Sequence, residues 1–156
     1  MLWQTHVTIG AITGALYAGQ GREIFIAAGL SAVGALIPDI DTPNSKLGNI
    51  TVVSKGINSI FGHRGAMHSL VGCIFILLLL SAVIPKALLL YIGLGYLSHL
   101  FADMLNPSGI PLLWPVKTRF RIPIVKTGSD IERYILLPGL LILLGKVFLP
   151  LIAVYI

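Results

Sequence analysis

The sequence predicts an all-α protein: a polytopic bundle of about five transmembrane helices, with two interfacial loops on one face of the membrane. Hydrophobic residues make up 56% of the 156-residue chain and charged residues only 11%, whereas a soluble domain carries about 25% charged residues. The mean hydropathy of +0.92 is also far from that of a soluble domain. The apolar residues gather into five segments, which we expect to pack as a single domain covering residues 1–156.

Each predicted span is close to the length of roughly 20 apolar residues that a membrane crossing requires. In order, the spans are residues 7–20, 24–38, 66–84, 87–105 and 134–156. The first two are rich in Gly and Ala, which favours close contact between helices inside a bundle. Because two spans separate them, the two long loops, residues 39–65 and 106–133, lie on the same face of the membrane.

Basic residues are concentrated on the face that carries these loops. Eight of them lie there: Lys46, Lys55, Arg64, Lys117, Arg119, Arg121, Lys126 and Arg133. The opposite face carries Arg22 and Lys86. This asymmetry predicts that the loop-bearing face lies in the cytoplasm. The net charge of +5 is therefore interpreted as membrane topology, and no nucleic-acid partner is expected.

Histidine and acidic residues are confined to the same face. All four histidines and five of the six acidic residues fall in the loops or near the span ends that adjoin them. Ionisable groups at membrane depth are costly and usually functional, so a cluster from distant parts of the chain predicts a common partner that offsets its desolvation. The candidate ligands of that partner are His6, Asp39, Asp41, His63, His68, His99 and Asp103.

Imidazole and carboxylate groups together suit a divalent transition metal, with zinc favoured and manganese or iron also compatible. The single cysteine, Cys73, lies inside an apolar run, which excludes a thiolate site. His99 and Asp103 are four residues apart, so a helix would place both on one face. Asp39 and Asp41 are two residues apart, so an extended stretch would place both carboxylates on one side, where one of them could bridge two ions. We therefore expect one or two ions, with His6 as a ligand or as a group that orients a ligand.

The second loop has the character of an anion site. Lys117, Arg119 and Arg121 alternate with uncharged residues, so an extended segment would point all three cations the same way. Together with Arg64 they could hold a phosphate or a lipid headgroup. The alternative is a basic interfacial stretch that is only attracted to anionic lipid. Glu132 is expected to act as a proton shuttle or as a partner of a ligand.

At these residues the chain resembles the YdjM-type family. The shared motifs are Thr5-His6, Pro38-Asp39-Ile40-Asp41, His63-Arg64-Gly65, His68-Ser69, Ser98-His99 with Asp103, Asn106-Pro107 with Gly109, and Thr127-Gly128-Ser129 with Glu132. The family consists of small bacterial and archaeal inner-membrane proteins described as predicted metal-dependent hydrolases, some of them under LexA control. The resemblance implies a metal-dependent hydrolase in the inner membrane and leaves its substrate open.

The sequence thus favours a hydrolase that uses a metal-activated water at the cytoplasmic interface. An amphiphile would reach a site at this depth laterally, so we expect a phospholipid or another lipid phosphate ester as substrate, among membrane lipids as partners. A metal-independent lipid phosphatase with a His nucleophile is one alternative. Its Pro-Ser-Gly-His motif, however, would precede the His-x-x-x-Asp pair, whereas Pro107-Ser108-Gly109-Ile110 follows it. The non-enzymatic alternative, a divalent-cation transporter or sensor, would want polar groups leading to both faces.

Overall fold

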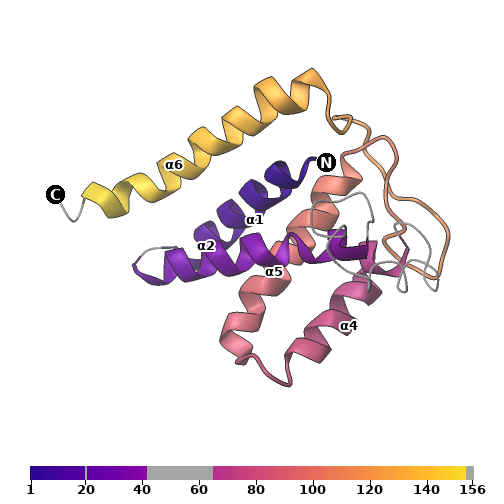
Figure 1. Ribbon diagram of the computed structural model, residues 1–156, viewed down its shortest axis with the longest axis horizontal. Coiled ribbons are helices and arrows are strands. Elements are labelled where there is room, and N and C mark those ends of the chain that lie inside the picture. Colours follow the sequence, from indigo (N-terminus) through magenta and orange to yellow (C-terminus); the bar gives the residue numbers. More distant parts are fainter. Residues whose placement is uncertain (20, 42–64, 154–156) are drawn as a thin grey trace.

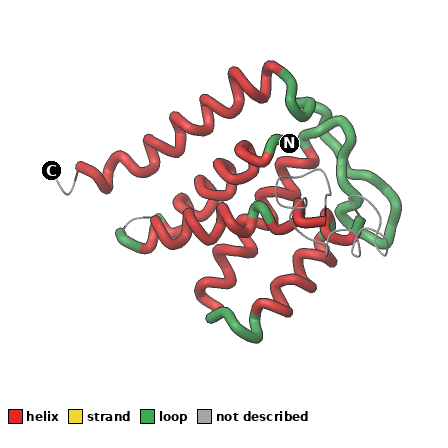
Figure 2. The backbone as a smooth tube through the Cα atoms, viewed as in Figure 1, coloured by secondary structure: helices red, strands yellow, loops and turns green. Residues whose placement is uncertain are grey.

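The computed structural model describes residues 1–19, 21–41 and 65–153, and this part of the chain is helical without any β-strand (Figure 1, Figure 2). Its α-helices are α1 (Trp3–Ala18), α2 (Glu23–Gly34), α4 (Leu70–Leu80), α5 (Lys86–Met104) and α6 (Leu137–Ala153). Short 3₁₀ helices cover Ile37–Asp41 and Ala66–His68, and a π-helix at Ile131–Leu136 leads into α6. The predicted all-α class is confirmed for the described residues.

Two described segments are long and apolar enough to cross a membrane. They are Glu23–Ile40, with a mean hydropathy of 1.6, and Lys86–Met104, with 1.4. The helices α1, α4 and α6 contain 16, 11 and 17 residues, fewer than the roughly 20 of a full crossing. A bundle of about five spans is therefore not confirmed, although every predicted span overlaps an α-helix.

Helix α1 lies at the centre of the bundle, where it packs against α2, α5 and α6, while α4 packs against α5. The N-terminus, the end of α2, the start of α4 and the end of α5 meet at one end of the molecule, on the right in Figure 1. The turn between α4 and α5 and the end of α6 lie away from this region. Four sequence-distant segments therefore come together at one place.

Small residues allow the central helices to approach closely. A Cβ atom at Gly14 of α1 would overlap the carbonyl oxygen of Ala27 in α2, and one at Gly95 of α5 would overlap that of Ser31. Only glycine fits at such backbone contacts. The use of Gly for helix–helix packing predicted for the first two spans is confirmed at Gly14, and Gly95 shows the same packing in the fourth.

The second loop is fastened to the end of α5 by backbone hydrogen bonds. Ile110 and Phe120 form an antiparallel bridge, with distances of 3.1 and 2.9 Å between nitrogen and oxygen. The N–H of Ile122 donates to the carbonyl of Met104 at 2.7 Å, and that of Val125 donates to Leu105 at 3.0 Å. These bonds hold the loop next to the helix that carries His99 and Asp103.

Candidate metal centre

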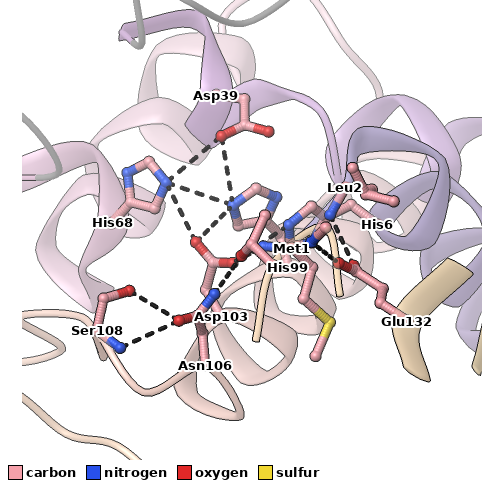
Figure 3. A network of polar contacts seen from close by, with 12 residues as sticks. Met1, Leu2, His6, Asp39, His68, His99, Asp103, Asn106, Ser108 and Glu132 are labelled. Carbon is pink, nitrogen blue, oxygen red and sulfur yellow. Dashed lines mark hydrogen bonds and ion pairs between the residues drawn. The ribbon is translucent and has the colours of Figure 1, made fainter. Parts of the chain in front are cut away.

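Five of the predicted ligands lie together where the four segments meet (Figure 3): His6, Asp39, His68, His99 and Asp103. They come from α1, from the two 3₁₀ helices and from α5. Four of these side chains are at most 2% exposed, whereas Asp39 is 19% exposed. The cluster is therefore buried and is most open on the side of Asp39.

Local structure explains how the short 3₁₀ helices present their ligands. Pro38 has no N–H to continue α2, and the chain tightens into the 3₁₀ helix that carries Asp39. On the other segment, Ser69 caps α4: its Oγ accepts from the N–H of Gly72 at 3.1 Å and donates to the carbonyl of Ala66 at 2.5 Å. The Tyr96 hydroxyl donates to the carbonyl of Met67, the residue before His68. His68 is thus held between two fixed backbone positions.

The orientation of His99 leaves one ring nitrogen available for a metal. Its Nδ1 lies 2.7 Å from the carbonyl oxygen of Ala35 at the end of α2. Because a carbonyl can only accept, Nδ1 carries the proton and donates it, and the lone pair is on Nε2. Histidine ligands of metals are commonly oriented by such a bond to a backbone carbonyl. His99 Nε2 therefore faces the cluster as a ready ligand.

Three of the ligand atoms are spaced to hold one ion. The Nε2 atoms of His68 and His99 are 3.4 Å apart, and Asp103 Oδ2 lies 3.7 Å from each of them. Asp39 Oδ1 is 3.7 Å from His68 Nε2 and 3.9 Å from His99 Nε2. A tetrahedral zinc site with bonds of about 2.0–2.2 Å places its ligand atoms about 3.3–3.6 Å apart. His68, His99 and Asp103 therefore fit three corners of such a site, and the fourth would be open for a water. Asp39 is close to both histidines but does not form one such group with Asp103.

His6 lies beside this set and belongs to a second group. Its ring stacks on that of His99, with centroids 3.8 Å apart, and its Nε2 is 3.3 Å from Asp103 Oδ1. His6, Asp39 and His99 also offer one ligand atom each within 4.8 Å of one another. The N-terminal amine of Met1 contacts the same Oδ1 of Asp103 at 2.6 Å. Asp103 thus presents Oδ2 to His68 and His99, and Oδ1 to His6 and the amine.

Three predicted site residues cannot be placed in this cluster. The backbone of Asp41 ends the first 3₁₀ helix, but its side chain is not among those described. His63 and Arg64 lie outside the described residues.

Glu132 and the three loop cations lie apart from the five clustered side chains. Glu132 is fully buried, and its carboxylate accepts hydrogen bonds from the backbone N–H groups of Leu2 and Gly128. Lys117, Arg119 and Arg121 are exposed. Arg119 donates to the carbonyl of Ser108 at 3.3 Å, and Arg121 donates to that of Pro107 at 3.3 Å. The two arginines therefore cover the turn that follows α5.

Sequence reasoning missed the groups that support the cluster. Asn106 Oδ1 accepts from both the N–H and the hydroxyl of Ser108, and its amide donates to Thr127 Oγ1. The sequence signal for Asn106 and Thr127 is that both occur in the family motifs quoted above. The Ala35 carbonyl that orients His99 has no side-chain signature and could not have been found from sequence.

Comparison with known proteins agrees with the motif pattern. The family described as YdjM inner membrane protein matches residues 1–155. The chain belongs to this family. It is 45% identical over 109 residues to the inner membrane protein YdjM of Escherichia coli (strain K12), a match that covers 64% of this chain and 56% of that protein. The match to the Shigella flexneri protein of the same name has the same extent, so the chain spans about half the length of these two curated relatives.

A third relative matches over more of its length. The uncharacterized protein YvsG of Bacillus subtilis (strain 168) is 38% identical over 141 residues, which cover 87% of this chain and 88% of that protein. No solved structure matches the chain. Membership of the family confirms the predicted location in the inner membrane.

Proposed function

We propose that this protein is a membrane-embedded, metal-dependent hydrolase that acts at the cytoplasmic interface on a phospholipid or another lipid phosphate ester. The observation that carries the proposal is the buried cluster of three histidines and two aspartates, brought together from four segments at one end of the helices. Such a cluster is costly to desolvate unless its members share a partner. A divalent cation is the partner that suits this donor set.

Zinc is the first choice for that cation, and manganese and iron share the same types of ligand. His68, His99 and Asp103 would hold one ion and leave a position for water. His6 would either orient Asp103 or, together with Asp39, contribute to a second ion. When bound, the ion would lower the pKa of a coordinated water toward about 7 and so supply a nucleophile at neutral pH.

The protein's own groups set the geometry for that chemistry. The bond from His99 to the Ala35 carbonyl fixes the tautomer, and the contact of His6 with Asp103 orients the carboxylate. Asp39 is the most exposed of the five, so water and substrate would approach beside it. Burial of the other four keeps bulk water from competing for the ligand atoms.

The loop cations support a phosphate ester as the substrate. Lys117, Arg119 and Arg121 are exposed on a loop whose backbone is bonded to the end of α5. Guanidinium and ammonium groups stabilise the anionic transition state of a phosphoester. Arg64 would add a fourth cation to this set. Apolar helices next to the site suit an amphiphile that enters from the membrane.

The test is a metal analysis of the purified full chain combined with hydrolysis assays on lipid phosphates in detergent micelles. We expect bound zinc or a related metal, and turnover that chelation abolishes. His68→Ala should lose both properties, whereas the control Glu23→Gln, at the start of α2 away from the cluster, should keep them. Full turnover after chelation, with a trapped phosphohistidine, would instead support the metal-independent phosphatase. Metal flux into vesicles without hydrolysis would support the transporter.

A further inference from the structure

We propose that Glu132 is a positioning residue, which sets the geometry of the metal centre by fixing the start of α1 and with it the side chain of His6. This inference rests on the proposed metal centre. It assigns Glu132 a role that acts through backbone groups rather than through transfer of a proton.

Glu132 joins two distant segments through hydrogen bonds to their backbone, an arrangement that we call the clamp. Its Oε1 accepts from the N–H of Leu2 at 2.7 Å, and its Oε2 accepts from the N–H of Gly128 at 2.7 Å. The side chain is fully buried. Both oxygens are therefore engaged with backbone donors, and the contact with Leu2 is drawn in Figure 3.

Helix α1 has no acidic residue of its own to satisfy its first turn. Leu2 occupies the N-cap position and provides no side-chain cap. The first N–H groups of a helix have no partner within the helix, and a negative charge at that end interacts favourably with the helix dipole. Glu132 supplies both the acceptor and the charge from 130 positions along the chain.

On one side the clamp binds Leu2, which is linked to the metal centre through His6. The first bond of α1 runs from the N–H of His6 to the carbonyl of Leu2 at 3.2 Å. The position of Leu2 therefore sets the position of His6, whose ring stacks on His99 and contacts Asp103. A shift of the helix start would move His6 against both ligands.

On its other side the clamp binds the turn at the end of the second loop, just before the π-helix. Gly128 has a positive φ of 72°, which favours glycine, and this conformation belongs to the turn whose N–H Glu132 binds. The adjacent Thr127 accepts the hydrogen bond from Asn106, three residues after Asp103. Glu132 thus connects the helix of His6 with the region that follows the helix of Asp103.

Two substitutions remove the hydrogen bonds of this clamp to different extents. Glu132→Ala removes both acceptors. Glu132→Gln keeps one acceptor oxygen and turns an NH₂ group, which can only donate, toward the other backbone N–H. Asp130→Asn is the matched control because Asp130 is an exposed acid two residues away, and its side chain makes no cap hydrogen bond to the helix that follows it.

The experiment measures Co²⁺ binding by the full chain in detergent micelles, through the visible absorption bands of tetrahedral Co²⁺. We expect Glu132→Ala to weaken Co²⁺ binding roughly 10- to 100-fold, as substitution of groups behind metal ligands typically does, and to change the bands. Glu132→Gln should show a smaller effect of the same kind, and Asp130→Asn none. In the metal-free protein, amide exchange at Leu2 and Gly128 should accelerate in the two Glu132 variants only.

The outcomes separate this inference from the proposed function. Normal Co²⁺ affinity and bands in both Glu132 variants, with only turnover reduced, would overturn the positioning role in favour of proton transfer. Unchanged exchange at Leu2 and Gly128 would overturn the clamp itself. Failure of the unsubstituted protein to give tetrahedral Co²⁺ bands would overturn the metal centre, and the exchange measurement would still decide whether the clamp exists. If Glu132→Ala does not fold, Glu132→Gln carries the same test.

Discussion

The middle of the bundle and its polar end, where the candidate metal centre lies, bury opposite kinds of groups. In the middle, Gly14 and Gly95 let backbones touch, and the buried groups are small or apolar. At the end, four imidazole or carboxylate side chains are buried to at least 98% within a few ångströms of one another. Replacing them with apolar residues would be expected to favour folding. The difference teaches that the middle is built for stability and the end for binding.

The largest expected effect is on the polar end. His68→Ala and Asp103→Ala should each remove most of the bound metal, because each deletes a ligand from the set formed by His68, His99 and Asp103. The helical content by circular dichroism should stay near that of the unsubstituted protein. Ser81→Ala, in the turn region after α4, is the control. Loss of helical structure together with metal would break the distinction between the two regions.

The next effect concerns the loop beside the polar end. Arg119→Ala combined with Arg121→Ala should lower turnover of a lipid phosphate by roughly 30- to 1000-fold, or about 2–4 kcal/mol, because the developing anion loses its contacts. Metal content should stay unchanged. The assay belongs in detergent micelles, where membrane orientation has no influence. Normal turnover there would show that the cations serve topology alone and would reopen the substrate class.

Metal should also link the polar end to overall stability. An ion that binds only the folded state at 100 times its Kd stabilises that state by about 2.7 kcal/mol. We therefore expect added zinc to raise the thermal midpoint of the metal-free protein. The same addition to His68→Ala should leave the midpoint unchanged. Equal shifts in the two proteins would mean that zinc binds elsewhere.

The smallest effect lies in the middle of the bundle. Gly95→Ala should lower the free energy of unfolding by about 1–3 kcal/mol because its Cβ overlaps the Ser31 carbonyl. Gly139→Ala in α6 is the matched control, since nothing lies within 4 Å of its added Cβ, and it should be neutral or slightly stabilising. Denaturation in mixed micelles measures both. A Gly95 variant as stable as the control would contradict the close packing of α2 and α5.

Much of this arrangement was predictable because its signals are local. Hydropathy gave the helices, and the confinement of His and Asp to span ends predicted that His6, Asp39, His68, His99 and Asp103 would lie together. Helix boundaries were less accurate. The predicted span 24–38 covers all but the first residue of α2 and the start of a 3₁₀ helix. The predicted span 66–84 begins with a 3₁₀ helix before α4 starts at Leu70. The cap at Ser69 sets that second boundary.

The remaining features depend on contacts that sequence patterns do not encode. The tautomer of His99 is fixed by a backbone carbonyl 64 positions away. The two oxygens of Glu132 meet backbone N–H groups whose residues, Leu2 and Gly128, carry no donor in their side chains. A motif can mark such a residue as important, but only the folded chain shows which groups it contacts.

The most direct test of the central claim is X-ray absorption spectroscopy of the zinc-loaded full chain. The account predicts about four nitrogen or oxygen ligands at about 2.0–2.2 Å, with the outer-shell scattering of two or three imidazole rings. His99→Ala should remove one ring from that signal. A shell of six oxygen ligands without imidazole scattering, unchanged in His99→Ala, would show that zinc binds away from the cluster and would contradict the account.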